Sequence, residues 1–132
     1  MDKIILHIID YFFIMFHIGL ILFNVFGWII PRWRFYNLIT LSLTAFSWLI
    51  LGIWYGFGYC PFTDWHWRVR ELLGYTYDSH SYVHFLILKI TGIHFPEKRI
   101  DFATVIVFFT AYFISIYFAV KKRILNQKLK NQ

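Results

Sequence analysis

The sequence is poor in charged residues and has almost no cysteine. Only 15% of its 132 residues are charged, whereas a soluble domain has about 25%. The single cysteine, Cys60, excludes a disulfide within the chain. Glycine-rich phosphate loops, nucleophile elbows and paired catalytic carboxylates are missing. These absences argue against a disulfide scaffold and favour a protein that is not an enzyme.

Apolar and aromatic residues are abundant instead, at 59% and 23% of the chain. A water-soluble fold of this size could not bury so much ring surface. Three apolar stretches, 4–30, 35–57 and 102–120, reach the length of about 20 residues that a helix needs to cross a bilayer. We expect an all-α integral membrane bundle of three transmembrane helices, forming one domain over 1–132, with a basic tail at 121–132.

The segment between the second and third spans, 59–101, predicts two short helices. The first, 64–73, would begin at Thr63 or Asp64, which suit a helix N-cap. The second, 79–91, would be capped by its first serine. It is apolar but short for a span and contains a lysine, so we expect it to be interfacial or re-entrant.

The net charge of +6 comes from basic clusters beside the spans. Arg32 and Arg34 follow the first span, and five cations lie in 121–132, whereas 59–101 is neutral overall. Under the positive-inside rule both clusters are cytoplasmic, which places the N-terminus outside the cell inner membrane. A four-span alternative would separate the clusters. Because they flank apolar runs, nucleic-acid binding is not expected. The end of the tail, 124–132, should fray into solvent or lie on anionic lipid.

A polar stripe marks the first span. Asp10, His17 and Asn24 are seven residues apart, and His7 lies three residues before Asp10, so all share one helix face. An ionisable group at this depth costs about 2.5–3.5 kcal/mol unless it meets protein or water. The second span carries a similar stripe: Asn37, Thr40, Thr44 and Ser47. We expect the two stripes to face each other, either to hold the helices together or to line a proton path or ligand pocket.

The third span has small residues on one face, and these indicate close helix packing. They are Thr104, Ala111, Ser115 and Ala119.

The stretch 60–70 contains Cys60, Thr63, Trp65 and Arg70, where the second span leaves the membrane. Tryptophan anchors a chain at the headgroups, and arginine binds phosphate or carboxylate. The stretch is therefore an interfacial anchor or a site for a lipid headgroup or partner.

Metal and haem sites are weaker hypotheses. His80 and His84 have the i, i+4 spacing of a metal pair, but the intervening glutamate of a zincin is absent. A haem b ligated by His17 lacks a second histidine on the later spans. No cofactor is expected.

The sequence resembles a family of small bacterial multi-pass membrane proteins known only as a domain of unknown function, with a Cys-Pro-Leu-Thr-type motif. The positions that carry the resemblance are Asp10, His17, Phe23, Gly27, Trp48, Cys60, Pro61, Thr63, Arg70, Gly74 and Tyr77. The departures are Phe62, His66 and Val69, which replace leucine, glutamate and leucine. The resemblance implies the topology and the choice of residues, and brings no activity.

Two functions from different classes remain. The first is a non-enzymatic accessory or subunit protein of a membrane complex, whose outer segment contacts another membrane protein or lipid. The alternative is a small-molecule or cofactor pocket, for haem, a metal or a lipid headgroup. The residues that would line it are Asp10, His17, Cys60, Arg70 and His84. A membrane enzyme is a third, weaker possibility.

Overall fold

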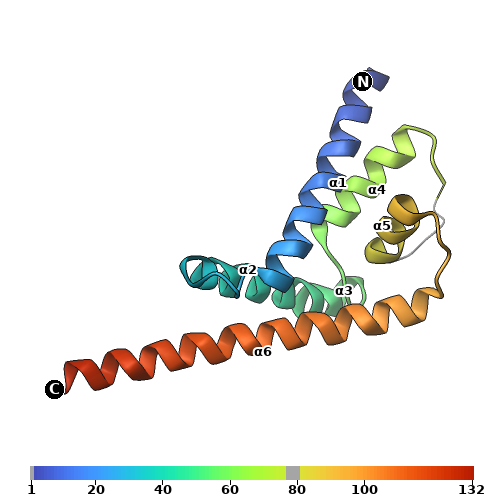
Figure 1. The fold of residues 1–132 in the computed structure, drawn as a ribbon. Coiled ribbons are helices and arrows are strands. Elements are labelled where there is room, and N and C mark those ends of the chain that lie inside the picture. The colour runs from blue at the N-terminus through green and yellow to red at the C-terminus, as the bar shows by residue number, and fades with distance from the viewer. Residues whose placement is uncertain (1, 77–80) are drawn as a thin grey trace.

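The computed structural model describes residues 2–76 and 81–132, which form helices and turns without any strand (Figure 1). The elements in chain order are α1 (Lys3–Phe26), η1 (Pro31–Trp33), α2 (Arg34–Phe46), η2 (Ser47–Leu51), α3 (Gly52–Tyr55), α4 (Pro61–Leu72), α5 (Tyr82–Thr91) and α6 (Glu97–Lys130). Three helical stretches are long and apolar enough to cross a membrane: Lys3–Phe26, Pro31–Tyr55 and Glu97–Lys130. The predicted all-α membrane bundle is confirmed.

The first span begins and ends at recognisable caps. The Asp2 carboxylate accepts a hydrogen bond from the backbone N–H of Ile4 at 3.3 Å, as an N-cap does. The helix ends before Gly27. A Cβ at this glycine would lie 2.8 Å from the Asn37 side-chain nitrogen and 2.5 Å from the Phe23 carbonyl oxygen. Glycine is therefore needed for α2 to approach the end of α1.

The second span contains a π-helical turn, η2, between α2 and α3. The Ser47 hydroxyl donates a hydrogen bond to the Tyr59 carbonyl at 2.6 Å. The chain leaves the helix through Gly56, whose φ of 104° is open to glycine. The hydrogen bond from Ser47 ties this exit back onto the span.

The two expected short helices both form, with different starts. Pro61 occupies the first turn of α4 and Cys60 is its N-cap, so the prediction of Thr63 or Asp64 as the cap is wrong. The fixed φ of proline suits a first helical position. In α5 the Ser81 hydroxyl caps the helix, whereas Ser79, the predicted cap, lies outside the described residues. Helix α5 ends at Gly92 in the left-handed conformation.

The last helix, α6, has 34 residues, which corresponds to about 51 Å. It is longer than the roughly 30 Å of hydrocarbon. The third apolar stretch was expected to end at Val120, and 124–132 to fray into solvent or lie on anionic lipid. The helix instead continues to Lys130, so the expectation of fraying is wrong. Lysine, leucine, arginine and glutamine are all good helix formers, so the change from apolar to basic composition does not end the helix.

The helices pack in two groups. Helices α2 and α6 lie side by side and antiparallel (Figure 1), around Leu41, Ala45, Phe108 and Ala111. Helix α4 lies along α1, and with α5 it encloses Ile14, Tyr82 and Leu86. The small-residue prediction holds for Ala111 and Ser115, which are buried, and fails for Ala119, which is exposed.

Candidate functional site

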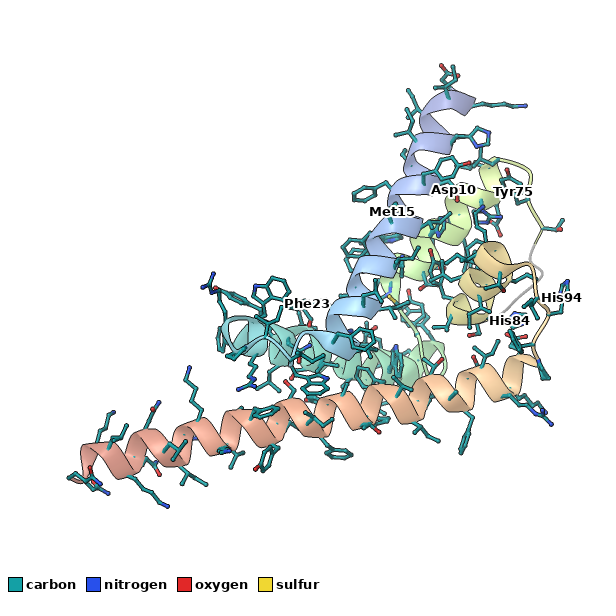
Figure 2. All side chains as sticks on the ribbon, viewed as in Figure 1. Asp10, Met15, Phe23, Tyr75, His84 and His94 are labelled. Atoms are coloured by element: carbon teal, nitrogen blue, oxygen red, sulfur yellow. The ribbon has the colours of Figure 1, made fainter. Side chains whose placement is uncertain are left out.

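Ionisable side chains gather where α4 and α5 pack against the N-terminal half of α1. Asp10 comes from α1, His66 and Arg70 from α4, and Tyr82 from α5; we call these four residues the polar cluster. Figure 2 shows Asp10 on the side of α1 that faces α4. Asp10 is 2% exposed and His66 is 0% exposed. Tyr82 is also buried and Arg70 is half-buried, so the cluster is largely shielded from solvent.

Hydrogen bonds connect all four members of the polar cluster. The Tyr82 hydroxyl donates to His66 Nδ1 at 2.7 Å, and His66 Nε2–H donates to Asp10 Oδ1 at 2.5 Å. Arg70 donates to both oxygens of Asp10, at 3.2 and 3.3 Å. The Asp10 carboxylate can only accept, so Nε2 of His66 carries a proton. Because a neutral imidazole has one donor and one acceptor nitrogen, Nδ1 then accepts from the Tyr82 hydroxyl.

Burial supports the same protonation states. It raises the pKa of Tyr82, so the phenol keeps the proton that it donates. Burial also lowers the pKa of His66, more than the neighbouring Asp10 carboxylate raises it. Removing a group from water disfavours its charged form. His66 is therefore neutral, and the only formal charges in the cluster are those of Asp10 and Arg70.

The Arg70 guanidinium compensates the charge of Asp10 and also contacts aromatic rings. It lies 4.3 Å from the ring centroid of Tyr75 and 4.6 Å from that of Phe85. A cation over a ring face is attracted by the ring's quadrupole. A buried ion pair stabilises a fold only when its remaining hydrogen-bonding groups are satisfied, and Asp10 meets this condition because both oxygens accept.

His17 lies beside the polar cluster. Its Nδ1–H donates to the Phe13 carbonyl at 2.9 Å, which leaves Nε2 to accept from the Thr63 hydroxyl at 3.4 Å. The ring centroid of His17 is 4.0 Å from that of Tyr82. His17 thus contacts both α4 and α5.

The expectation that the two polar stripes face each other is right only near Asn24. Its side chain donates to Thr44 at 3.1 Å, and Asn37 donates to its carbonyl at 3.2 Å. Asp10 and His17 face α4 and α5 instead of α2. The rest of the α2 stripe bonds elsewhere, and His7 is exposed. The expected pairing with α2 is wrong for Asp10 and His17, because α4 lies along this part of α1.

The other predicted site residues are dispersed. Cys60 is half-buried at the start of α4, and Trp65 is exposed. His84 is buried, and its Nε2–H donates to the Phe95 carbonyl at 2.9 Å. Its proposed metal partner, His80, lies outside the described residues. Within 2–76 and 81–132, no group of three or more His, Cys, Asp or Glu side chains could hold a metal ion.

Two members of the polar cluster, His66 and Tyr82, were missed in the sequence. They lie between the spans, where a polar residue does not stand out as it does in an apolar run. A signal did exist, because Thr63, His66 and Arg70 are spaced by three and four and so share one face of a helix. All three contact α1 side chains.

The arrangement is suited to fastening three helices together. Each hydrogen bond of the polar cluster joins two different helices, and the acidic, basic and neutral members satisfy one another. It could also move a proton between Tyr82, His66 and Asp10, because successive members are within hydrogen-bonding distance.

These features define an all-α integral membrane protein with three apolar spans, built for a lipid bilayer. More narrowly, the chain belongs to the family described as Protein of Unknown function (DUF2784), whose model matches residues 7–120. The matched range includes the whole polar cluster. No curated protein and no solved structure matches the chain.

Proposed function

We propose that the protein is a non-enzymatic accessory or subunit protein of a membrane complex. The observation that carries this proposal is the mutual pairing of the polar cluster. A catalytic acid or base must come within hydrogen-bonding reach of its substrate. Asp10 and His66 instead use their polar atoms on each other, on Arg70 and on Tyr82. This pairing favours a role in holding α4 and α5 on α1.

A partner would meet a row of aromatic side chains that runs from α1 to α4. The rings of Phe16 and Phe62 are 5.0 Å apart, and those of Phe62 and Trp65 are 5.4 Å apart. Phe62 and Trp65 are exposed. Aromatic residues carry much of the binding free energy at protein interfaces. Phe62 and Trp65 lie on α4, which the polar cluster holds on α1.

The partner contact can be tested with two matched double variants in native membranes. F62A/W65A removes the exposed α4 aromatics, and F102A/F113A removes two exposed aromatics of α6. After extraction in a mild detergent, the unchanged chain should migrate on a native gel in an assembly with a second protein. F62A/W65A should release it as a monomer, and F102A/F113A should not. If the chain without substitutions also migrated as a monomer, the proposal would be overturned.

We further propose that the N-terminus lies outside and the C-terminus in the cytoplasm of a cell inner membrane, because the basic clusters share one side. Reporter fusions after Arg34, Asp78 and Gln132 test this. A reporter active only in the cytoplasm should work after Arg34 and Gln132, and one active only outside should work after Asp78. Activity of the same reporter after Asp78 and Gln132 would contradict this orientation.

A further inference from the structure

The end of α6 beyond its apolar stretch is strongly basic. Residues 121–132 contain five cations and no acid. The cations are Lys121, Lys122, Arg123, Lys128 and Lys130. In Figure 1 this red end of α6 extends past the other helices. Its charge is thus not neutralised by acidic groups of its own segment.

The depth of this segment follows from the length of the apolar stretch. Charged residues bracket the stretch at Asp101 and Lys121, and the helix between them is about 29 Å long at 1.5 Å per residue. That length matches the roughly 30 Å thickness of the hydrocarbon. Tyr117 and Val120 therefore reach the edge of the hydrocarbon, and Lys121 reaches the headgroups.

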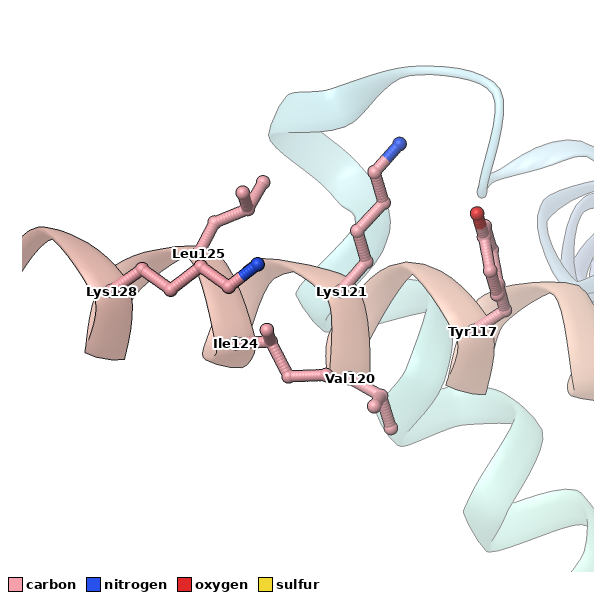
Figure 3. A pocket seen from close by; sticks show the side chains of 6 residues that line it. All are labelled: Tyr117, Val120, Lys121, Ile124, Leu125 and Lys128. Atoms are coloured by element: carbon pink, nitrogen blue, oxygen red, sulfur yellow. The ribbon is translucent and has the colours of Figure 1, made fainter.

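A groove lies on one face of α6 at this depth, with a volume of about 280 Å³. Its lining residues are Tyr117, Val120, Lys121, Ile124, Leu125 and Lys128 (Figure 3). The two lysines are seven residues apart, so they share a helix face, and Figure 3 shows Ile124 between them. The Lys121 ammonium is 6.0 Å from the ring centroid of Tyr117. One face thus combines two cations with apolar side chains.

We propose that this groove binds an anionic phospholipid of the leaflet at this end of α6. The lipid phosphate lies between the ammonium groups of Lys121 and Lys128. An acyl chain runs back along Val120 and Tyr117 towards the hydrocarbon. Each ammonium group can donate a charge-assisted hydrogen bond to the phosphate, which is stronger than one between neutral groups.

The apolar half of the groove identifies a lipid and not a free phosphate. Ile124 is 47% exposed and Leu125 is 50% exposed. Removing such aliphatic surface from water is favourable, and a basic helix with an aliphatic face characteristically lies in the membrane interface. An inorganic anion would leave both side chains in water.

The chain offers a matched control on the same turns of α6. Lys122 and Arg123 are exposed and do not line the groove, because at 100° per residue they lie away from Lys121 and Lys128. K121Q/K128Q and K122Q/R123Q therefore remove the same charge from the same segment. If the lipid is held by diffuse charge attraction, both double variants should weaken its binding equally. If it is held in the groove, only K121Q/K128Q should weaken its binding.

Lipid binding can be measured on the full-length protein in detergent by native mass spectrometry. Phosphatidylglycerol and phosphatidylcholine with identical acyl chains are the probes. The unchanged protein should bind phosphatidylglycerol at least tenfold more tightly than phosphatidylcholine. K121Q/K128Q should weaken the binding of phosphatidylglycerol roughly 10- to 30-fold, because it removes both charge-assisted hydrogen bonds to the phosphate. K122Q/R123Q should change the binding less than twofold. Circular dichroism checks that both variants keep their helices; if a double variant unfolds, K121Q and K128Q tested singly should each show about a fivefold loss.

Three results would overturn the proposal. Equal losses in the two double variants would mean diffuse charge attraction. Equal affinity for the two phospholipids would remove the role of the headgroup charge. Displacement of phosphatidylglycerol by inorganic phosphate at the same concentration would identify a free-anion site.

Discussion

The assembly of α1, α4 and α5 and the pair of α2 and α6 are held together differently. In the first, the paired charges of the polar cluster lie at the contact. In the second, Leu41 packs between small and aromatic side chains. Lipid is as apolar as leucine, so burying apolar surface gives little drive for helices to associate in a membrane. The α2–α6 pair depends on close fit, and the α1–α4–α5 assembly depends on groups that lipid would not tolerate alone.

The two regions also differ in how completely their polar atoms are satisfied. Each member of the polar cluster has a partner in another helix. Where α1, α2 and α6 meet, the side-chain oxygens of Asn24, Asn37 and Ser115 are buried without a hydrogen-bond partner among the described residues. The polar cluster should therefore be the more sensitive region to loss of one member, and the α2–α6 pair the more sensitive to a change of volume.

The largest effect should come from Asp10→Asn. The substitution keeps the volume and removes the charge that neutralises Arg70. Breaking a buried ion pair costs about 3–5 kcal/mol. We expect a large loss of stability in thermal unfolding of the detergent-solubilised protein. Asp64→Asn is the control, because Asp64 pairs with Arg68 in an exposed ion pair, which is worth at most about 1 kcal/mol. Similar melting temperatures for the two variants would show that the cluster does not hold α4.

Ala111→Leu should come next, because it tests the α2–α6 pair. Ala111 is 4% exposed and contacts the core around Leu41. Overpacking a tight contact costs about 1–3 kcal/mol. Ala119→Leu, at an exposed position of the same helix, should change the melting temperature little. If both variants were neutral, the pair would not depend on close fit.

A smaller difference should separate two tyrosine substitutions, one in each region. Tyr82→Phe leaves Nδ1 of the fully buried His66 without its donor, which costs about 1–3 kcal/mol. Tyr112→Phe removes a 3.0 Å hydrogen bond to the half-buried Ser42, whose hydroxyl can rotate to another acceptor. Denaturant unfolding should rank Tyr82→Phe as the more damaging. The reverse order would contradict the comparison between the regions.

The smallest effect is a dependence on pH. Burial lowers the pKa of His66 below the ordinary value of 6.5. Near pH 6.5, His66 therefore binds a proton in the unfolded chain but stays neutral in the folded chain. Stability should therefore fall as pH drops from about 7.5 towards 5.5. His66→Gln should flatten the plot of melting temperature against pH, and the control His94→Gln, at an exposed position, should not. An unchanged slope in His66→Gln would mean that His66 takes up its proton at the same pH in the folded and the unfolded chain.

The sequence predicted the elements of this fold better than their contacts. Asp10 and His17 stood out because each interrupts an apolar helix. Their partners did not stand out, because the hydrogen bond between Asp10 and His66 joins residues 56 positions apart, and local spacing says nothing about such a pairing. The start of α4 was missed because Thr63 and Asp64 both suit an N-cap, although Pro61 is equally suited to the first turn of a helix. The length of α6 was missed because charge was taken as the end of the helix.

The π-helical turn in the second span has a consequence for how the sequence can change. A wider turn inserts one residue beyond the α-helical repeat, so every side chain after Leu51 is rotated from the direction that a regular helix would give it. Deleting one residue within Ser47–Leu51 would restore a regular helix and turn Trp54 and Tyr55 towards a different side of the helix. A deletion here would therefore redirect all the later side chains of the span, whereas a substitution changes only one side chain.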